Sequence, residues 1–162
     1  MLHMKANQQN EETKLERVLR EAAMVNKTVI ITTVNSAWMM PNSIFDLFLE
    51  SFRVGNQTQV LLNHLIVVAF DQEAQNRCLE LHSHCYALRT EGVDFSSKVD
   101  FMSAEYLKMM WSRIGFLHTV LKKGYSFIFT VISFTLIHIG LILQNHVKPS
   151  PYFTSYNNLW FI

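Results

Sequence analysis

The polar residues best placed to contact a ligand lie at the ends of apolar runs that predict buried strands. Thr33 and Asn35 end the run that begins at Thr28, and Asp71 follows a second run over residues 65–70. In a parallel sheet, ligands bind at the carboxyl ends of the strands. Hydroxyl, amide and carboxylate groups at those ends can hydrogen-bond a polar ligand. The pattern therefore predicts Thr33, Asn35 and Asp71 as ligand contacts.

Two of these residues also have a structural interpretation. Asp71 precedes residues 72–82, which have a helical pattern, and Asp is strongly preferred as a helix N-cap. Asn35 suits a turn, where Asn side chains hydrogen-bond the nearby backbone. Both interpretations stay open on sequence alone.

The end of the fourth apolar run lacks the acidic residues that could hold a metal ion. The fourth apolar run, residues 125–130, ends at Thr130, and no Asp or Glu occurs after it. Mg²⁺ is held in proteins chiefly by carboxylate oxygens. Composition thus excludes a carboxylate-held metal at this strand end, so we predict no metal site and no catalytic residue in this chain.

Two cysteines and two histidines lie in one short segment, and both residue types are common zinc ligands. The residues are Cys78, His82, His84 and Cys85. Their spacing fits no standard zinc ligand pattern. We expect a buried cysteine pair and partly exposed histidines instead, and two cysteines do not settle the redox compartment.

Strand-like and helical patterns alternate along the first 130 residues. The helices are expected at 11–25, from Ser43, at 72–82 and from Ser103 to Gly124; the strands at 28–33, 65–70, 85–88 and 125–130. Ser43 and Asp46 resemble a capping box, and the first ten residues are expected to be loose. This alternation predicts an α/β fold: a mostly parallel sheet with helices on both faces.

The last of these helices has an apolar stripe that predicts its buried face. The stripe consists of Leu107, Met110, Trp111, Ile114, Leu117 and Leu121. Trp38 is also assigned to the core.

Length and charge restrict the class of protein. The chain has 162 residues, enough for one domain, and a net charge of +1 with no basic run. Nucleic acid is therefore excluded as an expected partner. The N-terminal segment is too polar for a signal peptide.

The C-terminal third differs in composition from the rest. From Gly124 to Val147 the chain has no charged residue, which is close to the length of a membrane-spanning helix. One interpretation is a transmembrane helix at about 125–147 that makes the membrane a partner. The other is a buried strand over 125–130 followed by unrelated sequence. In that case the edge of the fourth strand would be left unpaired.

Several segments resemble the plant nucleotide-diphospho-sugar transferase domain family. The similar segments are residues 28–35, 41–52, 62–65, 89–95, 106–111 and 124–130. The resemblance covers about 14–130. It divides the chain into a polar N-terminal tail (1–13), a partial transferase domain (14–130) and an unrelated apolar tail (131–162).

The resemblance implies the N-terminal, Rossmann-like half of a GT-A glycosyltransferase. Family members transfer a sugar from a nucleotide diphosphate sugar to a glycan or glycoprotein, and they are expected at the Golgi membrane. Lys108 lies where related enzymes carry a cation near the diphosphate. Arg113, five residues on, lies on a different helical face and is assigned to the surface.

Complete family members are expected to hold Mn²⁺ or Mg²⁺ on an Asp-x-Asp motif after the fourth strand. This chain has Val131-Ile132-Ser133 at that place. The expectation is therefore a truncated transferase that retains no metal, binds nucleotide sugar weakly and is inactive. The alternative is a small single-span membrane or interaction protein without catalytic activity.

Overall fold

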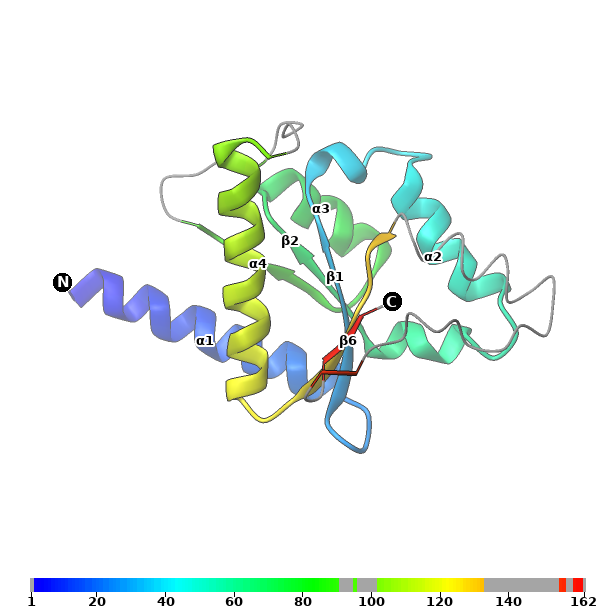
Figure 1. The fold of residues 1–162 in the computed structure, drawn as a ribbon, viewed down its shortest axis with the longest axis horizontal. Coiled ribbons are helices and arrows are strands. Elements are labelled where there is room, and N and C mark those ends of the chain that lie inside the picture. Colours follow the sequence, from blue (N-terminus) through cyan, green and yellow to red (C-terminus); the bar gives the residue numbers. More distant parts are fainter. Residues whose placement is uncertain (1, 91–94, 96–101, 133–154, 157–158, 162) are drawn as a thin grey trace.

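The computed structural model describes residues 2–90, 95, 102–132, 155–156 and 159–161 (Figure 1). A single sheet runs through the molecule between helices. Its first four strands in chain order are mutually parallel: β1 (Thr28–Val34), β2 (Leu65–Ala69), β3 (Cys85–Ala87) and β4 (Ser126–Phe129). The predicted α/β fold with a mostly parallel sheet is confirmed.

The order of the strands reverses at β1. With β5 (Ser155–Tyr156) and β6 (Leu159–Phe161), the sheet runs β3-β2-β1-β4-β6-β5. The chain thus steps outward from β1 to β3 and then crosses back to place β4 on the other side of β1. Open α/β sheets bind ligands at such a reversal, beyond the carboxyl ends of the strands. A ligand site is therefore expected beyond the carboxyl ends of β1 and β4.

Helices cover both faces of the sheet, as predicted (Figure 1). On one face, α1 (Leu2–Ala22) and α4 (Ala104–Lys122) pack against β1, β2 and β4. On the other face lie α2 (Ile44–Val54) and α3 (Gln72–Leu81). All five residues of β2 are buried, which explains why its sequence is continuously apolar rather than alternating.

Both ends of α4 follow the expected chemistry. The Ser103 hydroxyl accepts a hydrogen bond from the Tyr106 N–H (3.1 Å) and so caps α4. Gly124 has φ of +79°, the left-handed conformation that ends helices and that glycine adopts without steric cost. The boundaries predicted for this helix are confirmed.

The cap predicted for α2 is wrong in detail. Ser43 stands at the N-cap position, but its hydroxyl donates to the Trp38 carbonyl (2.8 Å) instead of accepting from the helix. Asp46 accepts the N–H of Asn42, which precedes the cap (2.7 Å). A short 3₁₀ helix, η1 (Ser36–Trp38), occupies the preceding loop and supplies the carbonyl that Ser43 binds. A second, η2 (Gln59–His64), precedes β2.

The prediction that the first ten residues are loose is wrong, because α1 begins at Leu2. The segment contains no Pro or Gly, and the helical pattern that starts at Leu15 extends backward through it.

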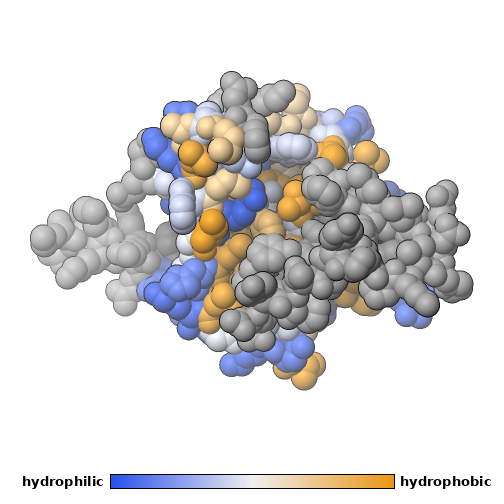
Figure 2. Space-filling model, in the orientation of Figure 1, coloured by the Kyte–Doolittle hydropathy of each residue, from blue (hydrophilic) through white to orange (hydrophobic). Residues whose placement is uncertain are grey.

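The apolar face predicted for α4 is also wrong in part. Leu107, Trp111 and Ile114 are exposed, Trp111 by 70%. The residues of α4 that enter the core are Phe116, Leu117 and Val120. Apolar residues extend around more than one face of this helix, so periodicity alone could not choose between the faces. Figure 2, in the same orientation as Figure 1, shows apolar and polar residues intermixed over this side of the molecule.

The expected membrane helix at about 125–147 is not confirmed. Residues 126–129 form β4, and residues 133–147 lie outside the described residues. In the part of the chain that the structure describes, no helix is long and apolar enough to cross a membrane.

The expected open edge of β4 is wrong. β6 (Leu159–Phe161) pairs with β4 in parallel, and β5 (Ser155–Tyr156) pairs with β6 in antiparallel fashion. Two short segments of the C-terminal tail thus supply the next strands of the sheet.

Candidate functional site

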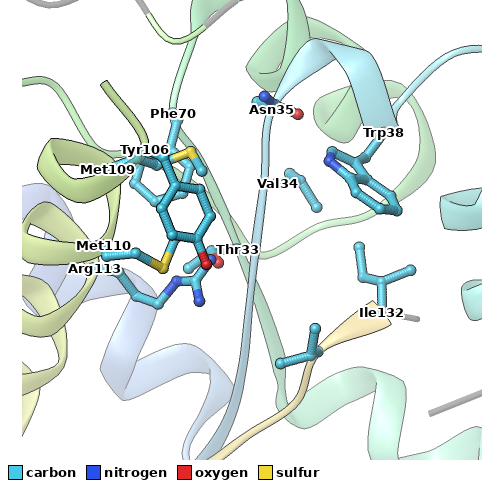
Figure 3. A pocket seen from close by; sticks show the side chains of 11 residues that line it. Thr33, Val34, Asn35, Trp38, Phe70, Tyr106, Met109, Met110, Arg113 and Ile132 are labelled. Carbon is cyan, nitrogen blue, oxygen red and sulfur yellow. The ribbon is translucent and has the colours of Figure 1, made fainter. Parts of the chain in front are cut away.

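A cavity of about 290 Å³ lies at the reversal point of the sheet. Its lining combines the end of β1 and residues that follow β1, β2 and β4 with one face of α4 (Figure 3). Thr33, Val34, Asn35, Trp38, Phe70, Tyr106, Met109, Met110, Arg113, Val131 and Ile132 line it. The Thr32 hydroxyl donates to the Thr130 carbonyl (3.0 Å), which fixes the ends of the two strands side by side.

Of the four predicted nucleotide contacts, the structure brings two, Thr33 and Asn35, into this cavity. Asn35 is 4% exposed, and its amide nitrogen donates to the Phe95 carbonyl (3.2 Å). Its Oδ1 is buried and has no hydrogen-bond partner among the described residues. An unpaired buried acceptor is costly, so Oδ1 is suited to receive an N–H or O–H donor from a ligand.

Asp71 has a structural role that accounts for both of its oxygens. Oδ1 accepts the Ala74 N–H (2.8 Å), the N-cap bond of α3, and Oδ2 accepts the Ser36 N–H (2.7 Å). The capping role predicted for this residue is confirmed. The same carboxylate joins α3 to the segment that follows β1, and therefore supports the wall of the cavity.

Lys108 does not line the cavity and is exposed. The face of α4 that points into the cavity carries Tyr106, Met109, Met110 and Arg113 (Figure 3). These positions follow the i, i+3, i+4, i+7 spacing of a single helical face.

Arg113 is the cation that sequence reasoning missed. It was assigned to the surface, yet it lines the cavity, and its guanidinium carbon lies 5.2 Å from the centre of the Phe129 ring in β4. Burial lowers the pKa of Arg113, and nearby Tyr106 opposes that effect. Helical spacing places Arg113 on one face with Tyr106, Met109 and Met110, but spacing alone does not show that this face meets the strand ends.

The donor atoms in the cavity do not fit a Mn²⁺ or Mg²⁺ ion. The lining side chains that the structure describes offer a threonine hydroxyl, an amide, a phenol, thioethers and a guanidinium, and no carboxylate is among them. Hard divalent cations select oxygen donors, of which carboxylates are the strongest in proteins. Within the described residues there is also no group of three His, Cys, Asp or Glu side chains that could hold a metal ion.

The cysteine and histidine segment contains a disulfide. Cys78 in α3 and Cys85 in β3 are bonded, with their Cα atoms 6.1 Å apart, as expected for a disulfide. The bond removes both sulfurs as thiolate ligands for zinc. Burial lowers the pKa of His82 and of His84, and the His82 Nε2 hydrogen-bonds the Leu65 carbonyl (2.7 Å).

The fold is that of an α/β protein with a cavity at the reversal point of a mostly parallel sheet. Residues 60–132, which include β2, β3, α4 and β4, match the model of the nucleotide-diphospho-sugar transferase family. This part of the chain belongs to that glycosyltransferase-like family, and the predicted resemblance is confirmed.

Two curated relatives, both from Arabidopsis thaliana, are similar to the chain. Uncharacterized protein At4g15970 is 56% identical over 124 residues, which are 76% of this chain and 34% of the relative. Uncharacterized protein At1g28695 is 47% identical over 123 residues, 72% of this chain and 37% of the relative. The chain therefore spans about a third of the length of these relatives. Comparison with solved structures finds no significant match.

Proposed function

We propose that this chain binds a nucleoside-diphosphate sugar in the cavity at the ends of β1 and β4, as the donor-binding part of a glycosyltransferase. The observation that carries the proposal is the position of the cavity. It lies where parallel α/β sheets bind nucleotides, and its cationic wall comes from the family-matched segment.

The cavity groups complement different parts of such a ligand. The buried Oδ1 of Asn35 can accept a hydrogen bond from a base or sugar donor, and the Thr33 hydroxyl can add a second polar contact. Trp38, which is 47% exposed, offers a ring against which a planar base or a sugar face can pack. Arg113 offers positive charge to a phosphate.

Titration calorimetry with UDP, GDP and their sugars tests the proposal. We expect binding with a Kd of about 1 mM or tighter for at least one nucleotide. Thr33→Trp should abolish it by filling the cavity, whereas Leu47→Trp, at an exposed position outside this cavity, should bind as the wild type does. Absence of binding by the folded wild type to all of these nucleotides would refute the proposal.

We further propose that this chain alone transfers little or no sugar, even with Mn²⁺ present. The described lining of the cavity has no carboxylate to place a metal on the leaving diphosphate. A transfer assay with radiolabelled nucleotide sugars, glycan acceptors and Mn²⁺ measures this directly. Robust turnover that Thr33→Trp abolishes would contradict the expectation.

We propose that the protein resides in an oxidising compartment, consistent with the Golgi location that the family resemblance implies. The support is the Cys78–Cys85 disulfide, because such bonds persist in secretory compartments and are rare in the cytosol.

Thiol labelling at lysis tests this location. Both cysteines of the chain are in the disulfide, so a maleimide-polymer should add nothing until a reductant is supplied, and two additions should follow. Reduction should also lower the free energy of unfolding by about 2.5 kcal/mol, the chain-entropy value for so short a loop. Two free thiols in protein trapped directly from cells would contradict the proposed compartment.

A further inference from the structure

We propose that the cavity binds the diphosphate of its ligand without a divalent cation, and that the Arg113 guanidinium supplies the positive charge in place of the metal. The inference rests on the proposed function and specifies how the charge of the ligand is met. It departs from the Mn²⁺ or Mg²⁺ dependence that the family resemblance implies.

The described acidic residues are committed elsewhere or lie away from the cavity. Asp71 follows β2 at the same end of the sheet, but both of its oxygens accept backbone N–H groups. No carboxylate is among the described lining residues, and the chain has no Asp or Glu after Thr130. A divalent cation would therefore enter a cavity that offers no described countercharge and already contains a guanidinium, which would repel it.

Arg113 is left without a countercharge in the described part of the chain. The ion pairs that the structure describes involve Arg53, Arg77 and Lys123, not Arg113. The Arg113 Nε is buried and has no hydrogen-bond partner among the described residues. A guanidinium remains protonated even when it is partly desolvated. Its charge is thus satisfied best by an anion that enters the cavity.

The guanidinium is also held in place before any ligand binds. It packs over the Phe129 ring, and Tyr106 and Met110 extend from the same face of α4 (Figure 3). A planar guanidinium presents paired N–H donors that match phosphate oxygens, so a fixed orientation lowers the entropy lost on binding.

The test is titration calorimetry with UDP and GDP, first in EDTA and then in excess Mn²⁺. We expect the Kd of the wild type to change by less than about twofold between the two buffers. Arg113→Gln should weaken binding of the diphosphates by about 10- to 100-fold, the range for losing a charged hydrogen bond. Arg113→Lys should recover part of this loss, because it restores the charge but not the paired donors.

Two controls separate a charge contact from a structural role. Lys108→Gln removes an exposed cation from the same helix and should change the Kd by about twofold or less. Uridine and guanosine carry no phosphate, so their affinities should be equal for the wild type and Arg113→Gln. Melting temperatures confirm that each variant is folded.

The outcomes separate this inference from the proposed function. Binding that requires Mn²⁺, or that Mn²⁺ tightens tenfold or more, overturns the inference and leaves the proposed function standing. Equal diphosphate affinity of folded Arg113→Gln and the wild type overturns it as well. Absence of nucleotide binding in both buffers overturns both proposals.

Discussion

Phe48→Ala is expected to lower the free energy of unfolding by about 3–5 kcal/mol, the usual range for removing a buried Phe side chain. Phe48 is fully buried at 0% exposure, and α2 uses it to pack against the sheet. Its ring centre lies 6.1 Å from that of Phe45 and 5.2 Å from that of Phe52, the latter edge-on. The substitution removes these ring contacts and leaves a cavity that rigid strands on one side cannot close.

A loss of this size is a large share of the total stability of a single domain, which is about 5–15 kcal/mol. Urea denaturation followed by circular dichroism measures it. Leu47→Ala on the same helix is the matched control, because Leu47 is 58% exposed and should lose about 0.5 kcal/mol or less. Equal losses of stability at the two positions would show that α2 does not pack against the sheet through the face that carries Phe48.

The central strands could be predicted because their sequences carry strong, local signals. β1 is a β-branched run with an apolar centre, and β2 is continuously apolar, as a strand buried on both faces is expected to be. Alternation with helices then restricts the connections to crossovers and the sheet to parallel pairing. The reversal of strand order at β1 depends on contacts between segments far apart in the sequence, so no local sequence pattern predicts it.

The contents of the site were only partly predictable. Thr33 and Asn35 follow from their position at the end of β1. Arg113 could not be assigned without knowing which face of α4 meets the strand ends, and the apolar stripe through Trp111 pointed to the wrong face.

The spacing of Cys78 and Cys85 in the sequence also could not show whether they form a disulfide. The spacing of these cysteines and the nearby histidines argued against a zinc site, but it could not choose between a disulfide and a reduced cysteine pair. The choice depends on how close α3 and β3 bring the two Cα atoms, which only the packed structure determines.

Asp71→Ala is expected to lower the free energy of unfolding by about 3 kcal/mol. The substitution removes the acceptor of two hydrogen bonds that involve a charged group, each worth about 1.5–3 kcal/mol and not fully additive. It leaves the N–H groups of Ser36 and Ala74 without this partner in a region where Asp71 itself is only 5% exposed. Asp71→Asn keeps one carbonyl oxygen and should lose about half as much.

Thermal and urea denaturation of both variants measure the effect, with Glu73→Gln as the control. Glu73 lies in the first turn of the same helix but is exposed, so its loss should be about 0.5 kcal/mol or less. Asp71 variants as stable as this control would refute the capping role.

The same Asp71→Asn variant separates support of the site from contact with the ligand. Because both oxygens face backbone N–H groups, the folded protein should bind UDP and GDP with a Kd within about twofold of the wild type, although it unfolds more easily. A tenfold loss of diphosphate affinity with unchanged stability would instead make Asp71 a direct contact of the nucleotide. The carboxylate would then have to leave the Ser36 or Ala74 N–H when the ligand binds. That rearrangement would change the amide hydrogen exchange of these two residues on addition of nucleotide, so exchange rates measured with and without UDP distinguish a fixed cap from a carboxylate that moves.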